Sequence, residues 1–180
     1  MRLARLILVF AVLMMNQALC VAQSASVVPT ESGAASRSGK FSGKVVSVTD
    51  GDTIDVLYEG SAERIRLNGI DCPEKRQPFG DKAKQFAAAQ CFDKTVTVTR
   101  FGRDRYGRTI GDVALPDGRV LNEELVRNGY AWWFRKYAPD NKKLEELEQG
   151  ARERKLGLWR DAQPVPPWAW RKRHWSGWGH

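Results

Sequence analysis

The stretch "VTDGDTIDVL", residues 48–57, combines a turn signal with the start of a strand. Asp50 and Asp52 flank Gly51, and an Asp-Gly pair is typical of tight hairpin turns. From Ile54 onward apolar and polar residues alternate, as they do in a strand with one buried face. A turn alone needs no second carboxylate. The stretch therefore predicts a hairpin whose two acids are either solvated or hold a positive partner.

The chain around this hairpin continues the β pattern. Apolar residues that share one face alternate with polar residues, and Gly, Asn, Asp and Pro between the segments favour turns. These segments predict five short strands: 44–48, 54–58, 64–70, 94–101 and 108–115.

Three other segments carry the helical period. Between 79 and 91, a mostly apolar stripe recurs at i, i+3, i+4 and i+7. A second helix is expected over 121–128, just before a glycine that suits a helix end. A third is expected to be capped by Asp140 or Asn141 and to stop near Gly157.

Together these elements predict an α+β fold, a five-stranded OB-fold β-barrel with three packed α-helices. OB-folds commonly bind nucleic acid, although a fold alone does not establish a function. The barrel and its helices are expected over 40–161. Residues 23–39 are small and polar and predict a flexible linker. Residues 162–180 form a tail rich in Pro, Trp and Arg.

Residues 1–22 have the features of an export signal. Arg2 and Arg5 precede the apolar run 6–15, which is too short to span a bilayer. Small residues follow and suit cleavage after Ala22, which predicts a secreted or periplasmic protein. A buried hydrophobic helix and a short membrane anchor are the alternatives.

The charge, the cysteines and the histidines narrow the possible partners and the possible chemistry. The formal charge of +8 would fall to +6 on loss of the signal, and it indicates an anionic partner. Cys72 and Cys91 would then remain, either as a disulfide or as two buried thiols. The histidines, His174 and His180, both lie in the tail, so an internal histidine base is absent.

Three stretches carry a family resemblance: "DGDT" (50–53), "RLNGIDCPE" (66–74) and "RDRYGR" (103–108). In this order they resemble the staphylococcal-nuclease-like (thermonuclease) family. The resemblance covers roughly residues 41–159 and includes "LNEELVRNGYAWW" and the closing "GLW". The combination is specific, whereas DGD alone would be a weak signal.

The residues themselves favour a cation site. Asp52 begins a strand and Asp71 ends one, and two carboxylates brought together favour a cation between them. The residue before Pro73 is held extended, which fixes the direction of the Cys72 carbonyl. Few oxygen ligands completed by water suit Ca²⁺, and Mg²⁺ less well. The resemblance implies Ca²⁺ bound by Asp52, Asp71 and the Cys72 carbonyl, with Asp50 nearby.

Two arginines and a glutamate complete the expected site. A planar guanidinium matches phosphate geometry and keeps its charge, which suits Arg66 and Arg108. The resemblance implies that Glu74 deprotonates the attacking water, and without an internal histidine a carboxylate is the natural base. The alternative for each residue is an ordinary solvated side chain, which is the interpretation adopted for the neighbouring arginines Arg64, Arg103 and Arg105.

The resemblance also implies the substrates. Both DNA and RNA should be cut, preferably single-stranded, to products with a 3′-phosphate, because phosphate-directed groups do not read bases. Tyr106 and Tyr137 match tyrosines of the family's nucleotide pocket, whereas Arg135 replaces another. No obligate protein partner is expected, and the protein should be a monomer. The adjacent aromatic residues predict core positions: Trp132, Trp133 and Phe134.

Two rival functions remain at this point. A non-catalytic OB-fold module that binds single strands has no need of the complete set of acids and arginines. A structural calcium protein leaves both arginines unexplained. Both rivals therefore account for fewer of the site residues, which are Asp52, Arg66, Asp71, Glu74 and Arg108.

The tail allows two interpretations. Its tryptophans alternate with basic residues, a pattern that suits nucleic acid or an anionic membrane surface. The favoured interpretation is a strap in which Trp168 packs on the barrel and the remainder is disordered. The residues concerned are Trp168, Trp170, Trp175 and Trp178, with Arg171, Lys172 and Arg173.

Overall fold

The computed structural model describes residues 39–175. The predicted export signal, nearly all of the predicted linker, and Trp178 lie outside the described residues. Within 39–175, no helix has the length and apolar character needed to cross a membrane.

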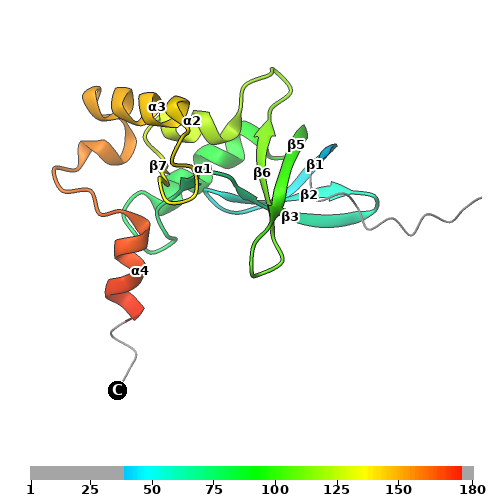
Figure 1. The fold of residues 1–180 in the computed structure, drawn as a ribbon, viewed down its shortest axis with the longest axis horizontal. Helices are drawn as coiled ribbons and strands as arrows, with labels where there is room; N and C mark the ends of the chain where they lie inside the picture. Colours follow the sequence, from blue (N-terminus) through cyan, green and yellow to red (C-terminus); the bar gives the residue numbers. More distant parts are fainter. Residues whose placement is uncertain (1–38, 176–180) are drawn as a thin grey trace, which may run out of the picture. The chain divides into compact units, whose positions relative to one another are not determined.

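Five strands close into a barrel in the order β1-β2-β3-β6-β5 (Figure 1). All neighbours are antiparallel except β3 and β6, which run parallel. This topology confirms the predicted α+β fold with a five-stranded OB-type barrel. The strands are β1 (Gly39–Asp50), β2 (Thr53–Tyr58), β3 (Ser61–Leu67), β5 (Thr95–Arg103) and β6 (Thr109–Ala114).

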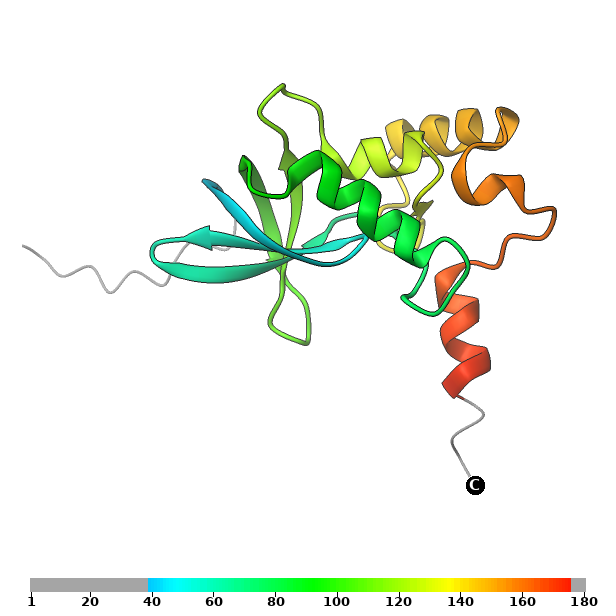
Figure 2. The same cartoon turned by 180° about the vertical axis from the view of Figure 1, so that it is seen from behind.

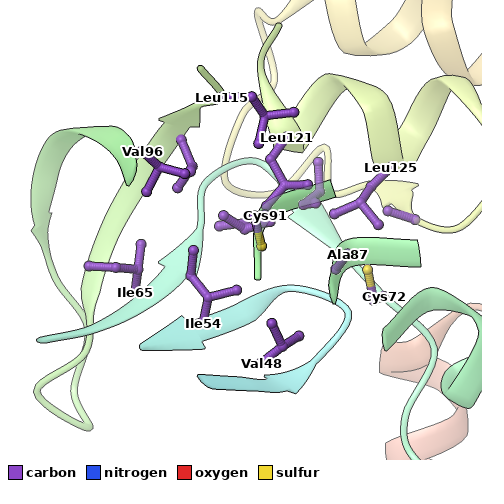
Figure 3. Packing of buried hydrophobic residues seen from close by; sticks show 14 of the residues in the cluster. Val48, Ile54, Ile65, Cys72, Ala87, Cys91, Val96, Leu115, Leu121 and Leu125 are labelled. Atoms are coloured by element: carbon purple, nitrogen blue, oxygen red, sulfur yellow. The ribbon is translucent and has the colours of Figure 1, made fainter. Parts of the chain in front are cut away.

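The barrel closes around the alternating apolar residues seen in the sequence. In β3, Ile65 and Leu67 are buried, whereas Arg64 and Arg66 lie on the opposite face. Figure 3 shows side chains from several strands and from α1 meeting in one core. Residues with no more than 1% of their surface exposed include Val45, Ile54, Val56, Ile65, Val96, Val98 and Val113.

The three predicted helices are present: α1 (Gly80–Cys91), α2 (Leu121–Arg127) and α3 (Lys142–Glu153). Helices α1 and α2 pack on barrel strands, and α3 packs on α2. Figure 2 shows α1 running along the barrel and α2 lying beside α3. Asn141, one of the two predicted caps, accepts a hydrogen bond from the Leu144 N–H (3.0 Å). Gly129 follows α2 with φ 70°, a left-handed conformation that glycine adopts without strain.

The predicted third strand is interrupted. Its pattern indicated one strand over 64–70, but β3 ends at Leu67, and Gly69 (φ 72°) turns the chain. The next two residues form β4 (Ile70–Asp71), which pairs with β7 (Trp132–Trp133) instead of continuing in the barrel. A carboxylate of α3, that of Glu148, accepts a hydrogen bond from the Trp133 N–H (3.1 Å) and so fixes this small sheet.

The tail is ordered further than expected. After η1 (Gly157–Arg160), residues Pro167–Trp175 form α4. Trp168 packs on Trp132 of β7 and on Phe134 instead of on the barrel itself, and the expectation of disorder beyond Trp168 is wrong as far as residue 175. The stacked aromatic rings anchor the start of the helix, which explains why this terminal segment has a defined place.

The two described cysteines, Cys72 and Cys91, are buried free thiols. Of the two alternatives left open by the sequence, a disulfide or two buried thiols, the structure shows the buried thiols. Burial raises the pKa of Cys91 to about 11 and that of Cys72 well above its usual value. Both sulfur atoms therefore belong to the core and are unreactive near neutral pH.

Candidate active site

Asp52 lies in the turn between β1 and β2, and two other segments of the chain hold it in place by hydrogen bonds. Its backbone carbonyl accepts a hydrogen bond from the Leu67 N–H (2.8 Å), and its Oδ2 accepts one from the Cys72 N–H (2.6 Å). The Asp52 N–H donates to Asp50 Oδ1 (3.2 Å). Only glycine fits at position 51, because a Cβ there would lie 2.8 Å from Cys72 Sγ. The turn is therefore packed directly against the segment that follows β4.

Arg66 joins Asp52 to Asp71. Its Nη2 lies 2.9 Å from Asp71 Oδ1 and 3.2 Å from Asp52 Oδ2. Its Nη1 donates to the backbone carbonyls of Leu67 (2.9 Å) and Ile70 (3.0 Å). Because one nitrogen reaches both acids and the other is fixed by the backbone, the orientation of the guanidinium is set before any ligand binds.

This cluster is largely removed from water. Asp52 is 6% exposed and Asp71 is 2% exposed. Burial opposes the charge of Arg66, but the charges of Asp52 and Asp71 outweigh it and raise the pKa of Arg66. Burial raises the pKa of Asp71 against the opposing effect of guanidinium groups. Burial, followed by the charge of Asp52, raises the pKa of Asp50 to about 7. Added positive charge would therefore stabilise the ionised forms of these buried acids.

The donor set fits a hard divalent cation. Asp52 and Asp71 offer carboxylate oxygens so close together that a single guanidinium nitrogen contacts both. Among residues 39–175, no three His, Cys, Asp or Glu side chains form a ready ligand set. A cation would therefore need backbone oxygen and water beyond the two carboxylates, a shell that Ca²⁺ accepts. The carbonyl of Cys72 remains the predicted backbone ligand.

Glu74 lies next to this cluster, in the loop between β4 and α1. Its Oε1 accepts a hydrogen bond from Arg171 Nη1 (2.6 Å), and Nη2 of the same guanidinium binds Asp71 Oδ2 (2.8 Å). The Glu74 N–H donates to Gln77 Oε1 (3.1 Å), which orders the loop. The Glu74 side chain is 42% exposed, so it is open to water, and it is linked to Asp71 through Arg171.

Sequence reasoning missed Arg171 as a site residue. The alternation of tryptophan and basic residues drew attention to the tail, but no local pattern links Arg171 to Asp71, which is 100 positions earlier. Only the folded chain places the two together. The candidate site therefore contains one more guanidinium than predicted.

Arg108 is held apart from this cluster by its own partner. Its Nε lies 2.7 Å from Asp104 Oδ2, and its N–H donates to Asp104 Oδ1 (3.0 Å). The guanidinium lies 5.5 Å from the centre of the Tyr106 ring. Both residues line a hollow of about 390 Å³ with Asp55, Ala62, Arg64 and Gly107.

The register of the barrel nevertheless places Arg108 on the same face as Arg66. In the parallel pair of β3 and β6, Ile65 lies opposite Thr109. The preceding residue, Arg108, therefore comes beside Arg64, which shares a strand face with Arg66 because side chains alternate along a strand. Arg108 thus lies just before β6 on the same barrel face as Arg66, but it borders Arg64 and not the acid cluster, and its side chain pairs with Asp104 of its own loop.

The three predicted substrate-contacting residues are not gathered in one pocket. Tyr106 is 69% exposed at the hollow beside Arg108. Tyr137 is 67% exposed and packs edge-on against Phe134, with ring centres 4.8 Å apart. Arg135 lies over the Trp133 ring (4.6 Å) and lines a different cavity of about 830 Å³. Trp132 and Trp133 are buried, as predicted, and Phe134 is half-buried.

The fold and the cluster define an OB-fold protein in which buried acids and arginines meet at the barrel's edge. Comparison with known proteins supports a narrower assignment. The family model described as "Staphylococcal nuclease homologue" matches residues 64–161. The chain belongs to this family and is a nuclease, which confirms the resemblance and the class of enzyme expected from the sequence.

Similar proteins occur in bacteria and plants. An "Uncharacterized endonuclease" of Escherichia coli O157:H7 is 50% identical over 131 residues, which cover 73% of this chain and 85% of that protein. A "Micrococcal nuclease" of Shigella flexneri is 43% identical over 141 residues, covering 73% and 81%. The "Staphylococcal-like nuclease CAN1" of Arabidopsis thaliana is 36% identical over 114 residues, covering 63% and 35%.

Proposed function

We propose that the protein is a calcium-dependent, sugar-nonspecific nuclease that cuts DNA and RNA to fragments with a 3′-phosphate. The observation that carries this proposal is the cluster in which Arg66 bridges Asp52 and Asp71 beside Glu74. A buried acid pair can hold a cation, an oriented guanidinium can bind a phosphate, and a half-exposed carboxylate can accept a proton from water. These are the groups that phosphodiester hydrolysis requires.

Each group has a defined task in the reaction. Bound Ca²⁺ would supply positive charge to a phosphoryl oxygen. Glu74 orients a water molecule and accepts its proton as the water oxygen attacks phosphorus. Arg66 and Arg108 donate to the phosphoryl oxygens, whose negative charge grows in the five-coordinate transition state. The bond from phosphorus to the 5′ oxygen breaks, and that oxygen leaves as a hydroxyl after taking up a proton.

Substrate selection follows from what the site contacts. Guanidinium groups and a cation recognise phosphate, which is the same in DNA and RNA. The exposed ring of Tyr106, beside Arg108, can stack on an unpaired base, and Tyr137 and Arg135 can contact the strand further along. We infer a preference for single strands, whose bases are free to stack. We further propose that the protein acts as a monomer, outside the cytoplasm, after loss of residues 1–22.

The direct test is hydrolysis of single-stranded DNA by the purified protein in calcium and then in excess chelator. We expect hydrolysis that the chelator abolishes. Glu74→Gln and Arg66→Ala should each lower the rate by about 10²-fold or more, since each removes charge stabilisation or proton transfer in the transition state.

Matched controls separate these effects from general charge loss. Glu123→Gln and Arg119→Ala remove a carboxylate and a guanidinium that are ion-paired near α2, outside the candidate site. Both controls should keep nearly full activity. Binding of single strands without hydrolysis would instead support the non-catalytic OB-fold module, and wild-type rates in the Glu74 and Arg66 variants would refute their roles.

A further inference from the structure

The tail helix α4 places a guanidinium on two acids of the candidate site. Arg171 Nη2 lies 2.8 Å from Asp71 Oδ2. Arg171 Nη1 lies 2.6 Å from Glu74 Oε1 and 3.3 Å from Asp71 Oδ1. One side chain thus binds both the predicted metal ligand and the predicted base.

Contacts away from the acids fix the position of α4. The ring of Trp168 stacks on Phe134, with centres 5.1 Å apart and planes at 2°, and packs edge-on against Trp132 at 5.7 Å. Just before the helix, the Val165 carbonyl accepts a hydrogen bond from Gln77 Nε2 (2.6 Å). Because the side-chain oxygen of Gln77 also binds the Glu74 N–H, one residue ties the tail to the loop of the base.

Arg171 uses the oxygens that a cation would need. Asp71 Oδ1 is hydrogen-bonded to both Arg66 and Arg171, and Oδ2 is bonded to Arg171. A divalent ion on Asp71 would compete for these lone pairs and would lie beside a second positive group, which repels it. Docked Arg171 and a bound cation therefore disfavour each other.

Glu74 is affected by the same contact. Its Oε1, the oxygen that would take the proton from water, is occupied by the N–H of Arg171 Nη1. Proton transfer from water to Glu74 thus requires Oε1 to be released from Arg171. While α4 is docked, Arg171 therefore blocks both cation binding at Asp71 and proton transfer to Glu74.

We propose that α4 is a built-in latch: Arg171 acts as an internal cation on Asp71 and Glu74, and a divalent metal ion must displace it before the site becomes active. This inference rests on the proposed metal site. Displacement is feasible, because the Arg171 side chain is 41% exposed and α4 spans only nine residues. Metal binding and latch opening are then linked, and each favours the other.

The test is the calcium affinity of purified Arg171→Gln, measured by isothermal titration calorimetry without substrate. Loss of the competing guanidinium should tighten the dissociation constant by about 10-fold or more. Arg154→Gln, which removes the same charge from an exposed position at the end of α3 where Nε donates to the Gly150 carbonyl, should change it little. In the wild-type protein, calcium should speed hydrogen–deuterium exchange over residues 167–175.

The other outcomes are equally informative. Unchanged calcium affinity in Arg171→Gln overturns the latch while leaving the metal site intact, and a lower turnover at that unchanged affinity would make Arg171 a substrate-binding residue instead. If Arg171→Gln fails to fold, the exchange measurement on the wild-type protein decides, and slower exchange with calcium overturns the latch. An absence of calcium binding in every variant refutes the proposed metal site and the latch together.

Discussion

At the scale of single residues, Asp50 shows most clearly that the buried carboxylates of the site need a positively charged partner. Asp50 is the first acid of the turn between β1 and β2, and its pKa is raised to about 7 by burial and by the charge of Asp52. The pKa of an aspartate in an unfolded chain is 3.8. Between pH 3.8 and about 7 the native protein therefore holds a proton on Asp50 that the unfolded chain has largely released. Ionised Asp50 therefore destabilises the fold as the pH rises.

The expected consequence concerns Asp50→Asn in the presence of chelator. Below about pH 4 the variant and the wild type should be equally stable, because the carboxyl is protonated in both states. The advantage of the variant should grow up to about pH 7 and reach on the order of 2–4 kcal/mol. Urea unfolding at several pH values measures it. Calcium should shrink the difference, and a difference that does not vary with pH would contradict this account.

At the scale of elements, the β1–β2 turn, the segment after β4 and α1 form one packed unit. A Cβ on Gly51 would lie 2.9 Å from Ala83 Cβ of α1, in addition to its contact with Cys72. The hydrogen bond from the Cys72 N–H to Asp52 Oδ2 runs across the same interface. The spacing of the acids is thus set by core packing, and not by the turn alone.

Gly51→Ala should therefore disturb both stability and the site. We expect a loss of about 1–3 kcal/mol from overpacking, measured by urea unfolding, and weaker calcium binding. Gly39→Ala is the matched control, because no atom lies within 4 Å of the Cβ it would add. If Gly51→Ala is as stable as this control, the turn is not packed as described.

The same scale shows what the sequence could predict. The alternation in β3 placed Arg66 on the opposite face from Ile65 and Leu67, and the helical stripe before Cys91 predicted α1. The two-residue strands β4 and β7 carry no detectable period, so the break after Leu67 was missed. Short segments are defined by their partner, here the Trp132–Trp133 pair, and not by their own pattern.

At the scale of the whole molecule, the candidate site combines segments from the entire described chain. Asp52, Arg66 and Asp71 come from the motifs read in the sequence, whereas Arg171 comes from the tail. The motifs could be recognised because each is local. The contact between residues 71 and 171 depends on Trp168 docking against β7, a tertiary event that no sequence spacing encodes.

The most direct test of the account is the position of the cation in crystals grown with calcium, located by anomalous scattering. The account predicts one ion bound by Asp52 and Asp71, with the Cys72 carbonyl in its shell and Arg171 moved off both acids. An ion bound elsewhere, or none at this acid pair in saturating calcium, would contradict the claim that these segments converge to hold a cation beside Arg66 and Glu74.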